Sequence, residues 1–158
     1  MADAPTNASV ESTVSTLNDL IQACKDGENG YRTAAEVVAD SNLRHLFLSY
    51  SQQREDFAVE LQREVRRLAE DPTDTGHVTP ALQRGWMEIK AGLIQPDEAA
   101  IIAECERGED AAVQAYRKGL DSDLPTDVHV VVERQFLEVK DAHDYMRSLE
   151  RTHGEKDS

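Results

Sequence analysis

Apolar residues recur at steps of three and four along four long stretches of this chain, and this pattern constrains the fold more than any other feature. In the first stretch they are Val14, Leu17, Leu20, Ile21, Cys24, Tyr31, Ala34, Ala35 and Val38. Such spacing places side chains on one face of an α-helix. One β-branched run, residues 128–133, is too isolated to indicate a sheet, so the sequence predicts an all-α protein.

Turn and cap residues divide the chain into four long helices and one short helix. We expect long helices at about 9–38, 42–70, 97–120 and 125–152, and a short helix at 79–94. Asp40 or Ser41 can cap the second helix, and Thr79 followed by Pro80 is typical of a helix start. The helices define one bundle domain at residues 11–152, with disordered ends at 1–10 and 153–158.

The short helix lies between the second and third long helices. A helix of about 14 residues covers about 21 Å, so with its flanking loops it can return the chain along the length of a bundle. A simple up-and-down bundle would need only a tight turn at this point. We therefore expect two helical hairpins joined by a long crossover, as in ferritin-like bundles.

The charge of the chain excludes several classes of function. Its formal net charge is −14, which repels nucleic acid and anionic membrane surfaces. The N-terminal residues lack the basic and apolar regions of a secretion signal, and no stretch reaches the ~20 apolar residues of a membrane span. We expect a cytoplasmic protein with two reduced, buried thiols at Cys24 and Cys105.

A short motif occurs twice. Cys-x-x-Gly-Glu stands at residues 24–28 and again at 105–109, in the first and third long helices. The second and fourth helices correspond as well, through Gln53-x-x-Asp56 and Gln135-x-x-Glu138. The two halves therefore read as a repeated helical hairpin.

The apolar stripes predict one polar layer inside the bundle. Its members are Glu28, Gln53, Glu109 and Gln135, with Asp56 and Glu138 one turn further on. Carboxylates brought together in a core raise one another's pKa values and take up protons, or they recruit cations. We therefore treat Glu28, Asp56, Glu109 and Glu138 as candidate metal ligands, and Gln53 and Gln135 as ligands or hydrogen-bond partners.

A second interpretation of the same residues needs no metal. Tyr31, Tyr116 and the two glutamines can satisfy Glu28 and Glu109, with Arg54 or Arg134 supplying a positive charge. Such buried networks fix how helices register on one another. We also expect Trp86 to hold the short helix against the bundle, and His143 to be a boundary or surface residue.

Several segments together resemble a known group of proteins. They are "DGENGYRTAAE", "QQREDFAVELQ", "RGWMEIKAG", "CERGEDAAVQAYRKGL" and "FLEVKDAHDYMRSL". On these the chain, over roughly residues 12–151, resembles the ferritin-like superfamily, and more closely an uncharacterised bacterial family of ferritin-like four-helix bundles, a domain of unknown function.

The resemblance implies a homo-oligomer, a dimer or larger, and a carboxylate site for iron or manganese. Ferritin-like di-iron proteins carry Glu-x-x-His on their second and fourth helices, where this chain has Gln53-x-x-Asp56 and Gln135-x-x-Glu138. An oxygen-only set suits manganese, magnesium or calcium at least as well as iron. We expect a non-enzymatic association protein, related to stress physiology; the alternative is a degenerate metal-binding site with redox activity.

Overall fold

A computed structural model describes residues 7–68, 79–90 and 97–156, and the regular structure in these ranges is helical. The helices are α1 (Asn7–Val37), α2 (Ser41–Arg67), α3 (Pro80–Lys90), α4 (Glu98–Asp121) and α5 (Thr126–Lys156). The prediction of four long helices and one short helix between the second and third is confirmed.

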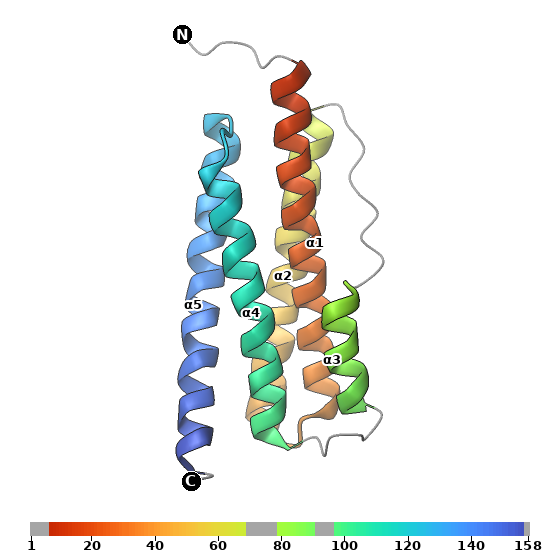
Figure 1. Ribbon diagram of the computed structural model, residues 1–158, viewed down its shortest axis with the longest axis vertical. Coiled ribbons are helices and arrows are strands. Elements are labelled where there is room, and N and C mark those ends of the chain that lie inside the picture. Colours follow the sequence, from red (N-terminus) through yellow and green to blue (C-terminus); the bar gives the residue numbers. More distant parts are fainter. Residues whose placement is uncertain (1–6, 69–78, 91–96, 157–158) are drawn as a thin grey trace.

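The long helices form two antiparallel hairpins, α1 with α2 and α4 with α5 (Figure 1). In Figure 1, α2 and α4 run in the same direction, so the chain between them has to return along the whole bundle. The short helix α3 lies in this crossover, outside the four-helix bundle and against α1 and α4. This is the predicted ferritin-like topology.

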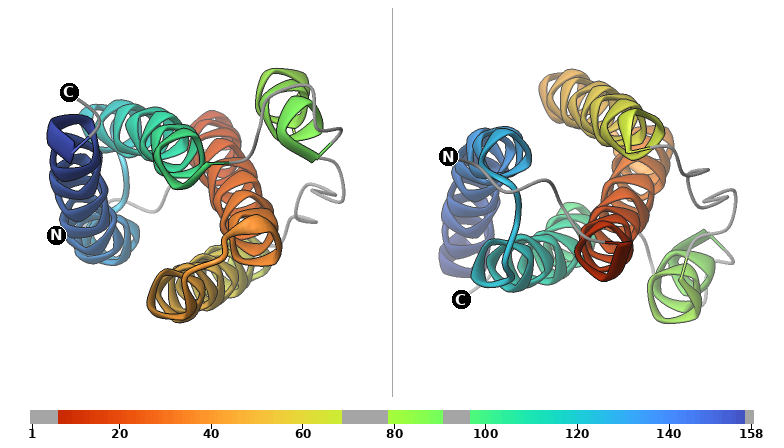
Figure 2. Two further views of the ribbon diagram at one scale, coloured as in Figure 1. Left: turned by 90° about the horizontal axis from the view of Figure 1, so that it is seen from below. Right: turned by 90° about the horizontal axis from the view of Figure 1, so that it is seen from above.

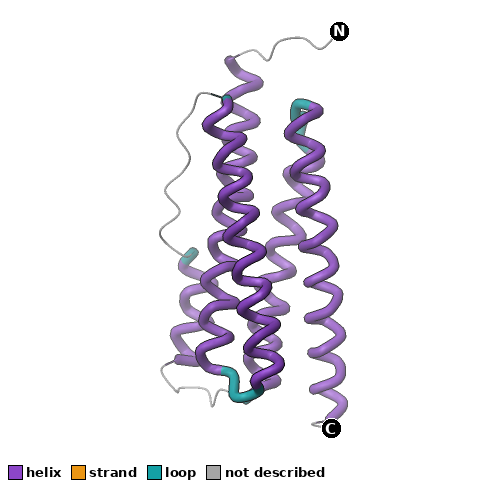
Figure 3. Tube along the Cα trace, turned by 180° about the vertical axis from the view of Figure 1, so that it is seen from behind, coloured by secondary structure: helices purple, strands orange, loops and turns teal. Residues whose placement is uncertain are grey.

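The two hairpins meet mainly along α1 and α4. Viewed along the bundle axis, α2 and α5 stand on the outer sides of this central pair and approach each other at few points (Figure 2). Figure 3 shows the same arrangement from behind, with α5 set apart from α2.

The core has two apolar clusters at different levels of the bundle. The first includes Leu17, Leu20, Leu61, Val65, Val128 and Val132, and the second includes Ala34, Phe47, Ile101, Ile102 and Met146 together with Trp86 and Ile89 of α3. On α2 and α4, the residues between these clusters include Arg54 and Glu109, which are almost completely buried. These two buried charged residues thus lie between the two apolar clusters.

Short side chains fix where two of the helices start. Asp40 caps α2 by accepting a hydrogen bond from the Leu43 backbone N–H at 2.9 Å, and Asp97 caps α4 by accepting one from Ala100 at 2.7 Å. Of the two candidates that the sequence offered for the cap of α2, Asp40 fills the position.

The helices at the two ends are longer than the sequence predicted. Helix α1 already begins at Asn7 and α5 continues to Lys156, inside the segments expected to be disordered. Val10 packs on the first apolar cluster, and His153 contacts the Leu149 carbonyl and Glu98, so each extension has a partner. The predicted ends of the second helix and of the short helix, at 70 and 94, lie outside the described residues.

None of the described helices combines the length and the apolarity that crossing a membrane requires.

Candidate functional site

Arg54 of α2 and Glu109 of α4 form an ion pair inside the bundle. The Arg54 Nη2 group donates to both carboxylate oxygens of Glu109, at 2.6 and 2.9 Å. The two side chains are only 1% and 0% exposed to solvent. An ion pair at this depth is screened little by water, so each charge depends on the other for compensation.

Two further side chains complete this group, which we call the polar centre: Arg54, Glu109, Tyr31 and Gln53. The Tyr31 hydroxyl donates to Glu109, and the Arg54 Nε group donates to the Gln53 side-chain oxygen at 3.3 Å. Arg54 also lies over the Tyr31 ring, with 5.7 Å between its Cζ atom and the ring centroid. The carboxylate therefore accepts from two donors, and one of them is a permanent cation.

The electrostatics keep Arg54 charged and Tyr31 protonated. Burial alone would lower the pKa of Arg54, but the surrounding groups, first among them the charge of Glu109, together outweigh burial and raise the pKa above its ordinary value. Burial, and then the charge of Glu109, raise the pKa of Tyr31 well above its ordinary value, so its hydroxyl remains a donor at neutral pH.

Gln135 belongs to a separate polar group. Its side-chain oxygen accepts from the Tyr116 hydroxyl at 2.7 Å, and its nitrogen donates to Glu60 at 2.7 Å. Cys24 lies 3.1 Å from the Tyr116 hydroxyl. This group links α1, α4, α5 and α2 without reaching Glu109.

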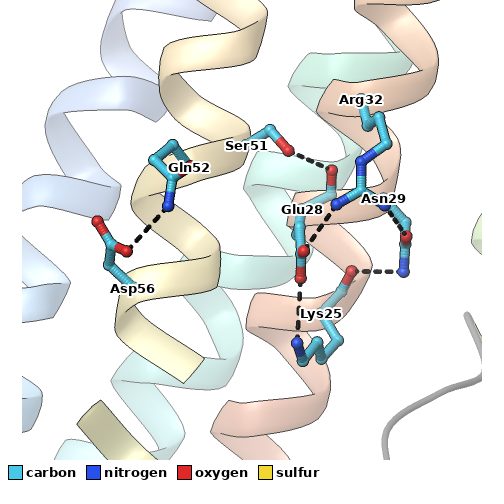
Figure 4. A network of polar contacts seen from close by, with 7 residues as sticks. All are labelled: Lys25, Glu28, Asn29, Arg32, Ser51, Gln52 and Asp56. Atoms are coloured by element: carbon cyan, nitrogen blue, oxygen red, sulfur yellow. Dashed lines mark hydrogen bonds and ion pairs between the residues drawn. The ribbon is translucent and has the colours of Figure 1, made fainter. Parts of the chain in front are cut away.

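Glu28 and Asp56 point into different surroundings (Figure 4). The carboxylate of Glu28 pairs with Arg32 at 2.8 Å and with Lys25 at 3.3 Å, both on its own helix. Asp56 is exposed and accepts from Gln52 at 3.0 Å. Neither side chain contacts Glu109 in the polar centre.

The structure does not gather the six predicted residues into one layer. Of the candidates Glu28, Asp56, Glu109, Glu138, Gln53 and Gln135, only Gln53 and Glu109 share the polar centre, both through contacts with Arg54. Asp56 and Glu138 are exposed. The buried stripe of α2 runs through Ser51, Arg54 and Ala58, and that of α5 through Gln135, Val139 and Ala142. Asp56, between Arg54 and Ala58, and Glu138, just before Val139, lie off these stripes and turn outward.

These residues do not fit the dinuclear iron or manganese centre that the ferritin-like resemblance implies. Such a centre needs several carboxylates around a common point. Here the guanidinium of Arg54 faces Glu109. Glu28 is buried but pairs with cations of its own helix, and Asp56 and Glu138 are exposed.

The network interpretation agrees with the geometry around Glu109, where Arg54 is the cation. It does not extend to Glu28, which pairs with Lys25 and Arg32 of its own helix. The other candidate cation, Arg134, pairs with Glu60.

Two glycines of α1 leave room for large side chains of neighbouring helices. A Cβ atom on Gly27 would lie 3.1 Å from Arg54 Nη1, and one on Gly30 would lie 3.2 Å from the Trp86 indole nitrogen. Trp86 is 6% exposed, as expected for a residue that holds α3 on the bundle. The glycine of the first Cys-x-x-Gly-Glu motif therefore gives Arg54 room to enter.

Asp26 also ties α3 to α1. Its carboxylate accepts a hydrogen bond from the Thr79 backbone N–H, at the start of α3, at 3.0 Å and one from Gln22 at 2.9 Å.

A cavity of about 20 Å³, the size of one water molecule, lies next to Trp86 and is lined in part by Tyr31, Arg54 and Glu109.

Both cysteines are free and buried. Burial raises the pKa of Cys24 to about 11 and that of Cys105 well above its ordinary value. They are therefore protonated thiols at neutral pH, as the sequence predicted for small buried residues.

Sequence reasoning missed one arrangement of metal-ligating side chains. Among the described residues, Glu106, Asp110 and His143 are the group whose ligand atoms approach one another closely enough for one ion. The two acids are four residues apart, a spacing that could have indicated a shared helix face. His143 is 12% exposed and lies at the α4–α5 boundary.

The topology and the packing define a ferritin-like four-helix bundle. The fold is similar to that of a mutant of Dps1 from Mycobacterium smegmatis, with a TM-score of 0.72 and 13% identity, over 92% of this chain and 99% of that one. At this identity the likeness concerns the fold alone.

The family described as "Domain of unknown function (DUF2383)" matches residues 12–122, and the chain belongs to this family. No curated protein matches the chain.

We predict that breaking the buried ion pair is costly. Glu109→Gln leaves the Arg54 charge buried without compensation, so the free energy of unfolding should fall by about 3–5 kcal/mol. The double variant Arg54→Met, Glu109→Gln should recover most of this loss. Arg67→Gln, which removes the solvent-facing contacts of Arg67 with Glu64 and Asp127, is the control and should cost less than about 1 kcal/mol. Urea denaturation measures all four proteins, and equal losses for Glu109→Gln and Arg67→Gln would contradict the assignment.

We also predict that two helical glycines respond differently to alanine. A Cβ atom on Gly119 would make ordinary contact with Leu20 at 3.4 Å, so Gly119→Ala should gain up to about 1 kcal/mol in helix propensity. Gly27→Ala crowds a guanidinium that Glu109 holds in place, and overpacking costs about 1–3 kcal/mol. In thermal unfolding, the melting temperature of Gly27→Ala should therefore be lower than that of Gly119→Ala. Equal gains in melting temperature would show that Arg54 moves freely and would contradict this prediction.

Proposed function

We propose that this protein is a non-enzymatic ferritin-like bundle that acts by association with further copies of itself, and that its polar centre is structural. The buried pair of Arg54 and Glu109 carries this proposal. The guanidinium of Arg54, a permanent cation of the protein itself, thus lies in the bundle interior next to Glu109.

The charge balance at the centre argues against a resident metal ion there. Glu109 already has a full compensating charge within hydrogen-bond distance, so a metal ion would meet the repulsion of the guanidinium. Displacing Arg54 would leave its charge buried in an apolar surrounding. The pair therefore favours a structural role for the carboxylate that the motif repeat singled out.

The pair is well placed to fix how the two hairpins register. It connects α2 of the first hairpin to α4 of the second, and Tyr31 adds a contact from α1. A sliding of one hairpin along the other would separate the charges while they remain buried. A purely apolar interface would resist such sliding less strongly, since apolar contacts are non-directional.

The chemistry of the interior supports the non-enzymatic part of the proposal. The two thiols are held in their protonated form by burial, and the tyrosines beside them have raised pKa values for the same reason. Burial thus suppresses the nucleophilic forms of these groups at neutral pH.

The proposed partner is a second or further copy of this chain, in the cytoplasm. The ferritin-like resemblance supports it, because proteins of that superfamily commonly pair or assemble through bundle faces. The net charge of −14 opposes association at low ionic strength, and salt reduces this repulsion.

A metal-content measurement tests the structural role of the centre. The variant Glu28→Gln, Asp56→Asn, Glu138→Gln removes three of the four candidate ligands and keeps the ion pair of Arg54 with Glu109. Both this variant and the unmodified chain are purified without chelator, loaded anaerobically with iron or manganese, and analysed for bound metal. We expect equal metal content in the two proteins. Loss of stoichiometric metal in the variant would support the alternative, a degenerate ferritin-like metal site.

Light scattering coupled to size-exclusion chromatography tests the association. We expect a mass that is a multiple of 17.6 kDa, with the associated fraction rising with protein concentration and with salt. A monomer at every concentration and ionic strength would contradict this part of the proposal.

A further inference from the structure

Three side chains meet on the surface of the second hairpin, outside the polar centre. Glu106 and Asp110 stand one turn apart on α4, and His143 reaches them from α5. The His143 Nε2 atom lies 2.5 Å from Asp110 Oδ1 and 3.7 Å from Glu106 Oε1. One ligand atom from each residue falls within 4.8 Å of the other two.

A fourth residue orients the imidazole. The other ring nitrogen of His143, Nδ1, lies 3.3 Å from Asp144 Oδ1. When Nδ1–H donates to Asp144, the lone pair of Nε2 faces Glu106 and Asp110. Carboxylates that hold the second nitrogen of a histidine in this way are typical of metal-binding imidazoles.

The surroundings combine partial burial with excess negative charge. The side chains of His143 and Glu106 are 12% and 17% exposed, whereas that of Asp110 is 50% exposed. Asp110 and Glu150 add negative charge around Glu106. A bound cation would relieve the repulsion between these acids, and the open side at Asp110 leaves room for water ligands.

We propose that Glu106, Asp110 and His143 form a binding site for one divalent transition-metal ion, of the class of Zn²⁺, Mn²⁺, Co²⁺ and Fe²⁺. One imidazole nitrogen with two carboxylate oxygens suits these ions better than Mg²⁺ or Ca²⁺, which prefer oxygen alone. At metal–ligand distances of about 2.0–2.2 Å, ligand atoms lie about 3.4 Å apart in a tetrahedral site. The distances from His143 Nε2 to Asp110 and to Glu106, 2.5 and 3.7 Å, bracket this value. Small rotations of the Asp110 and Glu106 side chains would bring both distances to it.

This site is independent of the polar centre. Glu109 points inward to Arg54, whereas Asp110, the next residue of α4, points outward to His143. None of the carboxylates at Glu28, Asp56, Glu109 or Glu138 belongs to it. Metal bound here is therefore unaffected by removal of those carboxylates, which separates this proposal from the alternative tested above.

Titration calorimetry of the full chain with ZnCl₂, MnCl₂ or CoCl₂ tests the site. We expect one ion per chain for at least one of these metals, and at least about tenfold weaker binding in Asp110→Asn and in His143→Asn. Asp144→Asn, which removes only the group that orients the imidazole, should weaken binding about tenfold.

The matched control is His129→Asn. His129 lies on the same helix and pairs with Glu133 at 3.0 Å across one turn, but it belongs to no three-ligand group among the described residues. Its replacement should leave affinity unchanged. Circular dichroism checks that each variant folds. If His143→Asn does not fold, the affinity of Asp110→Asn, a change at a half-exposed position, decides whether the site binds metal.

A second readout follows the imidazole directly. Sub-stoichiometric Mn²⁺ should broaden the NMR signals of the His143 ring before those of His129. The proposal is overturned by an absence of saturable binding for all three metals, or by equal losses of affinity in the His143 and His129 variants.

Discussion

The buried contact between Arg54 and Glu109 is the interaction on which the rest of the bundle interior depends. Transferring two charges from water into an apolar interior is expensive, and their attraction compensates only when the geometry is good. Here the guanidinium reaches both carboxylate oxygens, and Tyr31 and Gln53 satisfy further polar atoms. Because the two residues come from different hairpins, this requirement fixes how the hairpins sit against each other.

The accommodation of Arg54 also explains features of α1 and α3. A long side chain enters from α2 at the level of Gly27, where a larger residue would crowd it. One turn further, Gly30 accepts the indole of Trp86 in the same way. The loss of helix propensity at the two glycines is therefore offset by close contacts that a Cβ atom would crowd.

The sequence predicted the helices, their order and the crossover, because these follow from apolar periodicity and from turn residues. The sequence was a weaker guide to which polar side chains face the bundle interior. On α2 the periodicity fits Arg54 or Gln53 as the inward position, since neighbours differ by only 100° around a helix of 3.6 residues per turn. The structure resolves this in favour of Arg54 and leaves Asp56 exposed. Only the partner across the bundle, Glu109, decides which of two adjacent side chains faces the interior.

The two halves of the repeat differ in the residues that they place in the bundle interior. By the spacing of the repeat, Glu28 corresponds to Glu109, but the position on α5 that corresponds to Arg54 is Phe136. The first half thus supplies a cation for the glutamate of the second half, and the second half supplies none in return. Glu28 accordingly pairs with Lys25 and Arg32 on its own helix.

Phe136 instead packs beside the first apolar cluster, with Arg117 over its ring at 6.0 Å. A symmetric pair of carboxylates is the arrangement that a dinuclear metal centre requires, and a single arginine removes that symmetry. On the second half, the side chains proposed above as metal ligands, those of Glu106, Asp110 and His143, lie away from the interior pair. The same helix α4 therefore presents a structural carboxylate on one face and candidate ligands on another.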